Sequence, residues 1–565
     1  MRTKKKVLGV FAIGLFSVWF VPNPPLQSQS DLLVISGGTL IDGNGGPPLE
    51  HAMLLIKQGR IEQISQVGRI SIPEGARVID SRGKTILPGF IDGHIHFREW
   101  HGELLLANGV TTVVDTGDPD EWMMALMRAR ELGKIRTPRI FASGRRLGAE
   151  VPIRRTDLVR PVGSPRPHFL SLPLEEAKRR IREKKRRGLT VIKVDETWTN
   201  GDLEELVKLA HSLDLPIIGH SANPRDSANA GLDGIMHSWG IVPGTVGDPT
   251  NLDALRSGKI KDVYSVMDPS TFPELISLLV TKGVFLNPTP SLDGASKHQN
   301  EYELEDHQLL SLPELQYIPQ VARVAIFRKH HQLKSKTPSE RVNFQTKYQR
   351  FFREFVNAGG KLLLGTDTIV SCLPGVTLRR DMISLQESGI DKMKLIEAVT
   401  KNPAELYRLE DLGTIEPGKL ADIQIIKGDP LEDLSTLKNI EMVIIEGKRV
   451  DLDFHSDYNI GFTRPYAEDA SVVVPPKLKE INPKMTVEGS SSVQINVVGT
   501  GFDEFTTVLF NEVRLPTQLI SPTRLKATVD ALYLRSPGTY RISLTDPRFL
   551  GGPSDKYYGF IVAYR

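Results

Sequence analysis

Residues 86–96 read ILPGFIDGHIH, an apolar, strand-like run that ends in two histidines one residue apart, His94 and His96. Alternate residues of a β-strand project from the same face, so both imidazoles point the same way. Two neutral imidazoles at a strand end can bind a divalent metal ion. The run therefore predicts a metal-binding strand end, and further ligands are expected at the ends of other strands.

Strand-like and helix-like segments alternate downstream of this run. We expect eight strands, at residues 90–96, 111–116, 139–144, 191–194, 216–220, 234–237, 285–288 and 361–367. Helical patterns lie between them, at residues 174–187, 203–213, 272–282 and 345–358. Such alternation is typical of βα units around a parallel sheet, and the span is close to the roughly 250 residues of a TIM barrel. The expected fold class is therefore α/β, with a TIM (β/α)8 barrel at residues 86–411.

Four of the later strands carry a further candidate ligand near their C-terminal end, namely Lys193, His220, His237 and Asp367. Active sites of TIM barrels lie at this end of the strands, within the loops that follow them. Each signal is weak by itself, because a single histidine after an apolar strand is more often structural. Together with His94 and His96, the four residues predict one metal site.

With these residues the chain resembles the amidohydrolase superfamily, metal-dependent hydrolases built on a TIM barrel. The stretch GTIEPGKLAD at residues 413–422 closely resembles the family's return from the barrel to a flanking sheet. The stretch GVTTVVD at residues 109–115, with Asn402-Pro403-Ala404, resembles the imidazolonepropionase and Xaa-Pro dipeptidase branch. The resemblance implies a small composite β-sandwich, made of residues 31–85 and 412–455, beside the barrel.

The resemblance also implies what the candidate ligands do. His94, His96 and Asp367 would hold one divalent metal ion, and His220 and His237 would hold a second. Metal-activated hydroxide would cleave an amide or peptide C–N bond, while Asp367, as the catalytic residue, passes a proton to the leaving nitrogen. Zinc suits this histidine-rich ligand set, although manganese, iron or cobalt would also fit.

Lys193 has two interpretations. Metal ligands must be deprotonated, so a lysine ammonium cannot bind a cation. In binuclear members of the superfamily, a lysine on this strand carries a carbamate that bridges the two metals, and Lys193 lies at the matching position. The alternative is a structural lysine that forms an ion pair with Asp195 or Glu196.

One residue bears on the substrate. The segment from His94 to Arg98 resembles the His-x-His-x-Arg motif of dihydroorotases, in which the arginine binds a substrate carboxylate. A guanidinium fork suits such a bidentate contact. Arg98 is therefore a candidate substrate-binding residue, and the alternative is a structural arginine paired with Glu99 or Glu103.

Three functions remain open at this point. The first is an enzyme that cleaves a dipeptide or an N-acyl amino acid. The second is a lactone or phosphotriester hydrolase on the same metal site. The third is a non-catalytic barrel that serves as an extracytoplasmic interaction scaffold. The strand-end motifs also depart from common family wording, since His220 is followed by Ser221-Ala222 and Met236 precedes His237, so the pocket beside the metals differs.

The N-terminus predicts a cellular location, and the composition argues against nucleic acid as a partner. The chain of 565 residues has 71 basic and 68 acidic side chains, a net charge of +3, which provides no strong field for nucleic acid. The expected partner is a small-molecule substrate, and the oligomeric state is open.

Lys4–Lys6 and the apolar residues 7–21 predict a signal peptide at residues 1–30 and a periplasmic or secreted protein. An uncleaved N-terminal anchor is the alternative.

The remaining segments are a C-terminal domain and two long loops. Short alternating strands separated by turns predict an Ig-like β-sandwich at residues 473–565, and the motif at residues 499–502, GTGF, resembles an IPT/TIG domain. This domain is expected to bind a protein or surface partner. The scattered loop histidines His298, His307, His330 and His331 are expected to be solvent-exposed. The single cysteine, Cys372, excludes an intramolecular disulfide.

Overall fold

The computed structural model describes residues 32–149, 169–256, 259–293, 308–309, 311–319, 323, 326, 337–368, 372–456, 458, 476–502, 506–511, 513–545 and 557–564. The expected signal peptide and the loop histidines His298, His307, His330 and His331 lie outside the described residues. None of the helices in the described part of the chain is long and apolar enough to cross a membrane.

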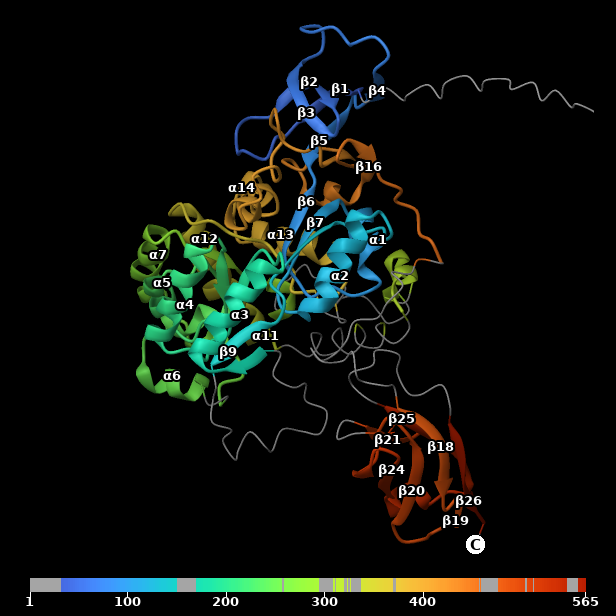
Figure 1. Ribbon diagram of the computed structural model, residues 1–565. Helices are drawn as coiled ribbons and strands as arrows, with labels where there is room; N and C mark the ends of the chain where they lie inside the picture. Colours follow the sequence, from blue (N-terminus) through green and yellow to red (C-terminus); the bar gives the residue numbers. More distant parts are fainter. Residues whose placement is uncertain are drawn as a thin grey trace, which may run out of the picture.

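Strands from two distant parts of the chain form one sheet (Figure 1). Its N-terminal members are β1 (Leu32–Leu40), β2 (Leu49–Lys57), β3 (Arg60–Gln66), β4 (Arg77–Asp80) and β5 (Lys84–Pro88). Its C-terminal members are β15 (Ile423–Lys427), β16 (Ile440–Ile445) and β17 (Lys448–Arg449). The order is β17-β16-β15-β5-β1-β2-β3, with β4 paired to β1. Antiparallel pairing places Ile86 opposite Ile425, and both are buried in one apolar cluster.

A central region of parallel strands follows β5 directly. The strands β6 (Phe90–Ile95), β7 (Val110–Asp115) and β8 (Arg139–Ala142) form one sheet. A second sheet has the order β10-β9-β11-β12-β13-β14. Its members are β9 (Arg146–Ala149), β10 (Phe169–Leu172), β11 (Ile192–Val194), β12 (Ile217–Gly219), β13 (Gly234–Met236) and β14 (Phe285–Asn287). Seven of the eight expected strands are thus present, with similar bounds.

The eighth expected strand, at residues 361–367, is an extended segment without a regular ladder. Isolated parallel bridges join Leu362 to Leu286 and Thr368 to Ile95, so the segment lies between β14 and β6. Asp92 of β6 also accepts hydrogen bonds from the amide and hydroxyl groups of Thr366, at 3.0 and 2.7 Å. Gly365 packs closely against the backbone of His94 within this segment. A Cβ at position 365 would lie 2.2 Å from the backbone nitrogen of His94, so only glycine fits there.

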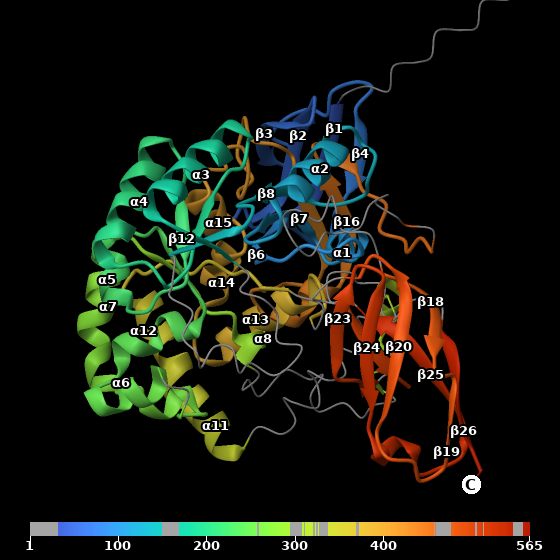
Figure 2. The same cartoon turned by 60° about the horizontal axis from the view of Figure 1, so that its bottom comes forward.

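Helices alternate with the central strands and lie outside them (Figures 1 and 2). The larger ones are α1 (His101–Ala107), α2 (Asp120–Glu131), α3 (Leu174–Arg186), α4 (Asn200–Ser212), α5 (Pro224–Ala230), α6 (Pro249–Arg256), α7 (Phe272–Thr281), α12 (Arg350–Asn357), α13 (Val376–Glu387), α14 (Lys392–Ala398) and α15 (Lys401–Leu406). The helices α8 (Pro290–Asp293) and α11 (Pro338–Asn343) and a π-helical turn (Phe344–Gln349) also belong to this part. In the series α3, α4, α5 and α7, each helix contacts the next, as expected for βα units.

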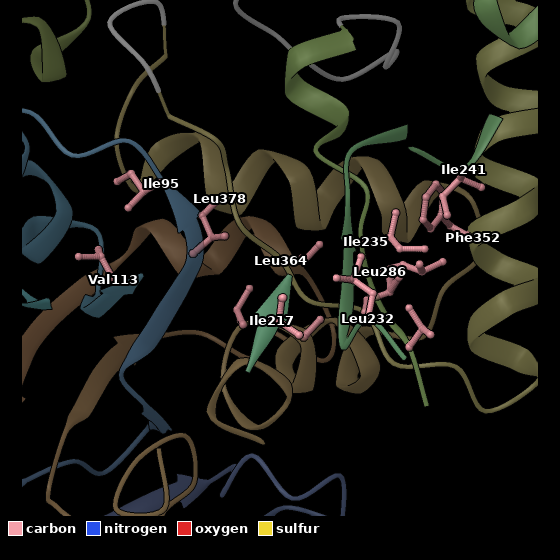
Figure 3. Packing of buried hydrophobic residues seen from close by; sticks show 14 of the residues in the cluster. Ile95, Val113, Ile217, Leu232, Ile235, Ile241, Leu286, Phe352, Leu364 and Leu378 are labelled. Carbon is pink, nitrogen blue, oxygen red and sulfur yellow. The ribbon is translucent and has the colours of Figure 1, made fainter. Parts of the chain in front are cut away.

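The apolar core lies between these helices and the strands. Ile217, Ile235 and Leu286 come from three neighbouring strands, and Leu364 from the segment at residues 361–368; all are buried (Figure 3). Phe352 of α12 belongs to the same cluster. The short apolar strand runs of the sequence are therefore explained by burial against the helices, and the strand ends are left to carry polar side chains.

The C-terminal region, drawn in red in Figure 1, is a separate β-rich unit. One sheet has the order β18 (Lys477–Asn482), β20 (Val493–Thr500), β24 (Arg524–Val529) and β23 (Thr517–Ser521). The other has the order β19 (Met485–Val487), β26 (Tyr558–Ala563), β25 (Gly538–Thr545), β21 (Thr507–Phe510) and β22 (Val513–Arg514). Buried residues of both sheets, such as Ile495 and Phe560, form one apolar cluster that consists of residues from this region alone.

Candidate metal centre

The six residues predicted as ligands are brought together at the C-terminal ends of the central strands. Three lie in or directly after β6 and β11, two directly follow β12 and β13, and one lies near the end of the segment at residues 361–368; in chain order they are His94, His96, Lys193, His220, His237 and Asp367. All six are buried or nearly so. Because parallel strands end at the same edge, distant positions of the sequence converge here.

His94, His96 and Asp367 form the first group of donors. Oδ1 of Asp367 lies 3.2 Å from Nε2 of His94 and 3.0 Å from Nε2 of His96. The backbone amide of Asp367 donates to the carbonyl oxygen of His94 at 2.6 Å, which fixes the two strand ends together. Oδ1 is buried and accepts no hydrogen bond from the described residues. Two imidazole nitrogens and one unsatisfied carboxylate oxygen are a ligand set that suits a divalent cation such as zinc.

His237 and His220 extend the cluster. The ring centroid of His237 lies 4.9 Å from that of His94 and 4.9 Å from that of His220. Nε2 of His237 also lies 3.8 Å from Oδ2 of Asp367. Asp367 therefore faces both groups of histidines, and an unbroken series of short contacts links the five side chains.

Lys193 lies inside this cluster. Its ammonium nitrogen Nζ is 2.8 Å from Nε2 of His94 and 3.2 Å from Oγ1 of Thr116, and the side chain is buried. Burial lowers the pKa of Lys193 to about 7, against an ordinary value of 10.5. A substantial neutral fraction near neutral pH permits reaction with carbon dioxide. The expected alternative, an ion pair with Asp195 or Glu196, is not seen: among the described residues, Asp195 pairs with Arg146 and Glu196 with His220.

The protonation of the ligands also suits a metal. Burial lowers the pKa of His94 to about 3, and burial likewise lowers the pKa of His96, His220 and His237. These imidazoles are therefore neutral at physiological pH, as metal ligation requires. Burial acts to raise the pKa of Asp367, but the surrounding histidines outweigh it and hold this pKa well below its ordinary value. The carboxylate is consequently ionised.

Two residues that the sequence did not identify contact Nδ1 of two candidate ligands and so orient their rings. Nδ1 of His94 lies 2.9 Å from the side-chain amide of Asn287, and Nδ1 of His237 lies 3.1 Å from Oγ1 of Thr289. Lys193 donates to Nε2 of His94, so Nδ1 carries the hydrogen, since a neutral imidazole has one acceptor nitrogen. An amide orientation with Oδ1 of Asn287 toward Nδ1 satisfies both groups and leaves Nε2 available to a metal.

Backbone strain gathers at the same place. His237, Thr289 and Asp367 have φ angles of 68°, 45° and 47°. His237 directly follows β13, Thr289 lies two residues after β14, and Asp367 lies in the extended segment at residues 361–368. Residues other than glycine seldom adopt positive φ, and such strain tends to cluster at functional sites. Beside them, the indole of Trp239 stacks on His237 with the ring centroids 3.9 Å apart and is 40% exposed. An apolar wall therefore borders the candidate ligands.

The comparison with known families agrees with this geometry. A profile of the amidohydrolase family matches residues 85–450, about two thirds of the chain. The chain belongs to the amidohydrolase family. The matched range includes all six candidate ligands and part of the composite sheet.

Curated relatives of this amidohydrolase-family chain match over short stretches. An N-acyl-D-aspartate deacylase from Alcaligenes xylosoxydans xylosoxydans is 41% identical over 92 residues, which are 15% of this chain and 18% of that protein. A dihydroorotase from Anaeromyxobacter dehalogenans is 39% identical over 71 residues, 13% of this chain and 16% of that protein. The matches thus span less than a fifth of the length of either relative.

Solved structures resemble the fold over a longer range. A Xaa-Pro dipeptidase with methionine bound in its active site has a TM-score of 0.54 at 23% identity, over 74% of this chain and 100% of that chain. A molinate hydrolase has a TM-score of 0.54 at 22% identity, over 75% of this chain and 95% of that chain. These similarities show a mixed α/β fold of the amidohydrolase type.

Arg98 is the predicted substrate-binding residue of this amidohydrolase-family chain. Its side chain donates hydrogen bonds to neighbouring groups of the protein. Its Nη1 donates to Oδ2 of Asp118 at 3.1 Å and to the carbonyl oxygens of His96 and Phe97 at 3.1 and 2.6 Å. Of the two predicted alternative partners, Glu99 and Glu103, Glu103 pairs with Arg136 and His455. The ion pair with Asp118 was missed because Asp118 lies in the loop after β7, far from Arg98 in the sequence. These contacts indicate a structural role for Arg98.

A different arginine reaches the candidate metal centre. Nε of Arg146, at the start of β9, lies 2.8 Å from Oδ2 of Asp195. Its Nη1 lies 2.9 Å from Nδ1 and 3.0 Å from Nε2 of His220. Oε2 of Glu196 lies 3.1 Å from Nδ1 of the same ring. The sequence did not identify Arg146, because it predicts a third strand that ends at Gly144, before β9 begins.

Proposed function

We propose that this chain is a binuclear metal-dependent amidohydrolase that cleaves an amide or peptide C–N bond in a dipeptide or an N-acyl amino acid. One observation carries the proposal: five neutral or anionic donors and one lysine with a lowered pKa meet at the ends of the central strands. Membership of the amidohydrolase family and the deacylase and dihydroorotase relatives support C–N bond hydrolysis.

The residues fit two divalent cations. His94, His96 and Asp367 would hold one, His220 and His237 the other, and a carbamate on Lys193 would offer an oxygen to each. When bound, such a pair of cations supplies Lewis acidity and makes hydroxide available near neutral pH. Zinc is the proposed metal.

The chain's own groups then perform the remaining steps. Asp367 is ionised and faces both histidine groups, so it can accept a proton and deliver it to the leaving nitrogen. Asn287 and Thr289 hold His94 and His237 in the tautomer that presents Nε2. Trp239, which stacks on His237, would provide an apolar wall on one side of the site.

We further propose that the central strands close into a (β/α)8 barrel, that residues 1–30 are a signal peptide, and that the protein acts in the periplasm or outside the cell. The bridges that join residues 361–368 to β14 and β6 support the closed barrel. The C-terminal unit is proposed to be an IPT/TIG-like Ig domain that binds a protein or surface partner, on the basis of its two sheets and single core.

A substrate screen tests the proposed activity. Protein reconstituted with zinc and bicarbonate is assayed against a library of dipeptides and N-acyl amino acids, with release of free amino acid as the readout. A lactone and a phosphotriester are included as competing substrates. We expect hydrolysis of at least one C–N substrate, abolished by chelation and restored by metal.

Asp367→Ala is the matched control, since it removes a ligand and the proton acceptor together. Metal-loaded protein that cleaves the lactone or phosphotriester but no C–N substrate would contradict the proposal. Metal-loaded protein without any hydrolytic activity would favour an interaction scaffold instead.

A further inference from the structure

Arg146 places a positive charge directly at the candidate metal centre. Its side chain is 15% exposed, and its Nη1 lies within 3.0 Å of both ring nitrogens of His220, one of the proposed ligands. Asp195, which is 2% exposed, contacts Nε at 2.8 Å. Nε of the guanidinium therefore contacts the buried carboxylate of Asp195, while Nη1 faces the candidate metal centre.

The contact with His220 cannot persist once that residue ligates a metal. A neutral imidazole has one acceptor nitrogen, so Nη1 can donate to only one of the two nitrogens it approaches. A metal ion would need this same nitrogen. The ion pair with Asp195 does not involve His220, so it can keep the guanidinium beside the site while Nη1 changes its partner.

The guanidinium of Arg146 would lie beside the proposed metal cations, and an anion between the positive charges would stabilise the arrangement. The planar fork matches a carboxylate, with which it forms charge-assisted and frequently bidentate hydrogen bonds. In an N-acyl amino acid or a dipeptide, the α-carboxylate is two covalent bonds from the scissile nitrogen. A carboxylate held next to His220 would thus leave the scissile amide beside the remaining ligands.

We propose that Arg146 binds the α-carboxylate of the substrate and makes the enzyme selective for N-acyl amino acids or dipeptides over uncharged amides. This inference rests on the proposed function. It assigns to Arg146 the role that the sequence suggested for Arg98, whose Nη1 is engaged by Asp118 and two carbonyl oxygens. Trp239, stacked on His237 and 6.0 Å from the ring of His220, provides an apolar wall for the substrate side chain.

The test measures binding without turnover. The probes are racemic 2-(2-methylpropyl)-4-oxopentanoic acid, which replaces the scissile nitrogen of N-acetyl-leucine by carbon, and its carboxamide. Calorimetric titration of zinc-loaded protein gives both dissociation constants. We expect the acid to bind roughly 10- to 100-fold more tightly than the amide, as for hydrogen bonds to a charged group.

Variants assign the preference to one residue. Arg146→Gln should remove the preference for the acid and leave amide binding within about threefold, while metal content stays unchanged. Arg146→Lys keeps the charge but loses the fork, so an intermediate preference is expected. Arg128→Gln is the matched control, because it removes the same charge from an exposed position on α2, where Arg128 pairs with Glu131.

The outcomes separate this inference from the proposed function. Acid binding by the wild type no tighter than amide binding, or an acid preference that persists in both Arg146 variants, would overturn the role of Arg146. Release of leucine from N-acetyl-leucine without any acid preference would overturn it and leave the proposed function standing. Arg146-dependent acid binding by zinc-loaded protein that cleaves none of the library substrates would contradict the proposed function alone.

Discussion

Nζ of Lys193 lies 2.8 Å from Nε2 of His94, deep in the core of the candidate metal centre. A protonated lysine in this place would compete with a metal for the imidazole nitrogen. The proposed carboxylation of Lys193 would remove that competition and convert a repelling group into an attracting one. Through this contact, carbon dioxide uptake would be linked to metal binding.

Carboxylation of Lys193 should depend on pH in a defined direction. Because burial lowers its pKa from 10.5 to about 7, the amine is mostly charged below about pH 7 and mostly neutral above it. At a fixed partial pressure of ¹³C-labelled carbon dioxide, metal-free protein should show a carbamate signal in ¹³C NMR that grows as the pH rises through 7. Lys193→Ala should lack this signal. A signal that appears only above pH 9 would contradict the lowered pKa.

Asp367→Asn should preserve the fold while slowing turnover by roughly 10²- to 10⁴-fold, the usual contribution of a general acid–base group. The amide can still offer an oxygen to a metal, but it cannot accept a proton at useful pH. Circular dichroism and metal content should stay close to wild type, which separates proton transfer from ligation. A variant with turnover within a few-fold of wild type would remove Asp367 from the proton-transfer role.

Asn287→Leu should weaken metal binding by roughly 10- to 100-fold, as is typical when a group that orients a metal-ligating histidine is lost. Leucine has a similar size but cannot hydrogen-bond Nδ1 of His94. Asn287→Asp retains an acceptor and should stay closer to wild type. Competition with a chromogenic chelator measures both affinities, and equal affinity in the leucine variant and the wild type would show that Asn287 does not orient His94.

A chain that ends after Tyr458 should remain folded and keep near-normal activity on small substrates. The C-terminal unit has its own apolar core, and the family match ends at residue 450. The residues just before the cut are worth keeping, because His455 contacts Glu103 at 2.9 Å and the hydroxyl of Tyr458 donates to the carbonyl of Arg136. A soluble, metal-loaded and inactive truncated protein would show that the C-terminal unit completes the active site.

The strand ends that carry the candidate ligands could be predicted from the sequence, because each follows a short apolar run. His94 and His96 follow one such run, and His220 and His237 follow two others. The sequence predicts a strand at residues 361–367, but not that its backbone lacks a regular ladder. Asp367 has a positive φ there and Gly365 approaches His94 closely, and both features depend on tertiary contacts.

The residues that support the ligands could not be predicted from the sequence, because their partners are brought close only by the fold. Asn287 is the last residue of the apolar strand β14, but an asparagine at a strand end is most often part of a turn, so the residue type alone did not indicate a role. Arg146 begins β9 after the short connection that follows β8, and its partners Asp195 and His220 are distant in sequence. For Arg98, nearby acidic residues suggested a partner, whereas Asp118 was brought in by the fold.

The central claim is that one site of six residues binds two divalent cations, and elemental analysis of the purified protein tests it most directly. After reconstitution with zinc and bicarbonate and removal of free metal, wild-type protein should hold close to two zinc ions per chain. Lys193→Ala should hold fewer, with partial recovery when a short carboxylic acid is added. Wild-type protein that holds no more than one zinc ion at saturation, or Lys193→Ala that holds as much as wild type, would contradict the account.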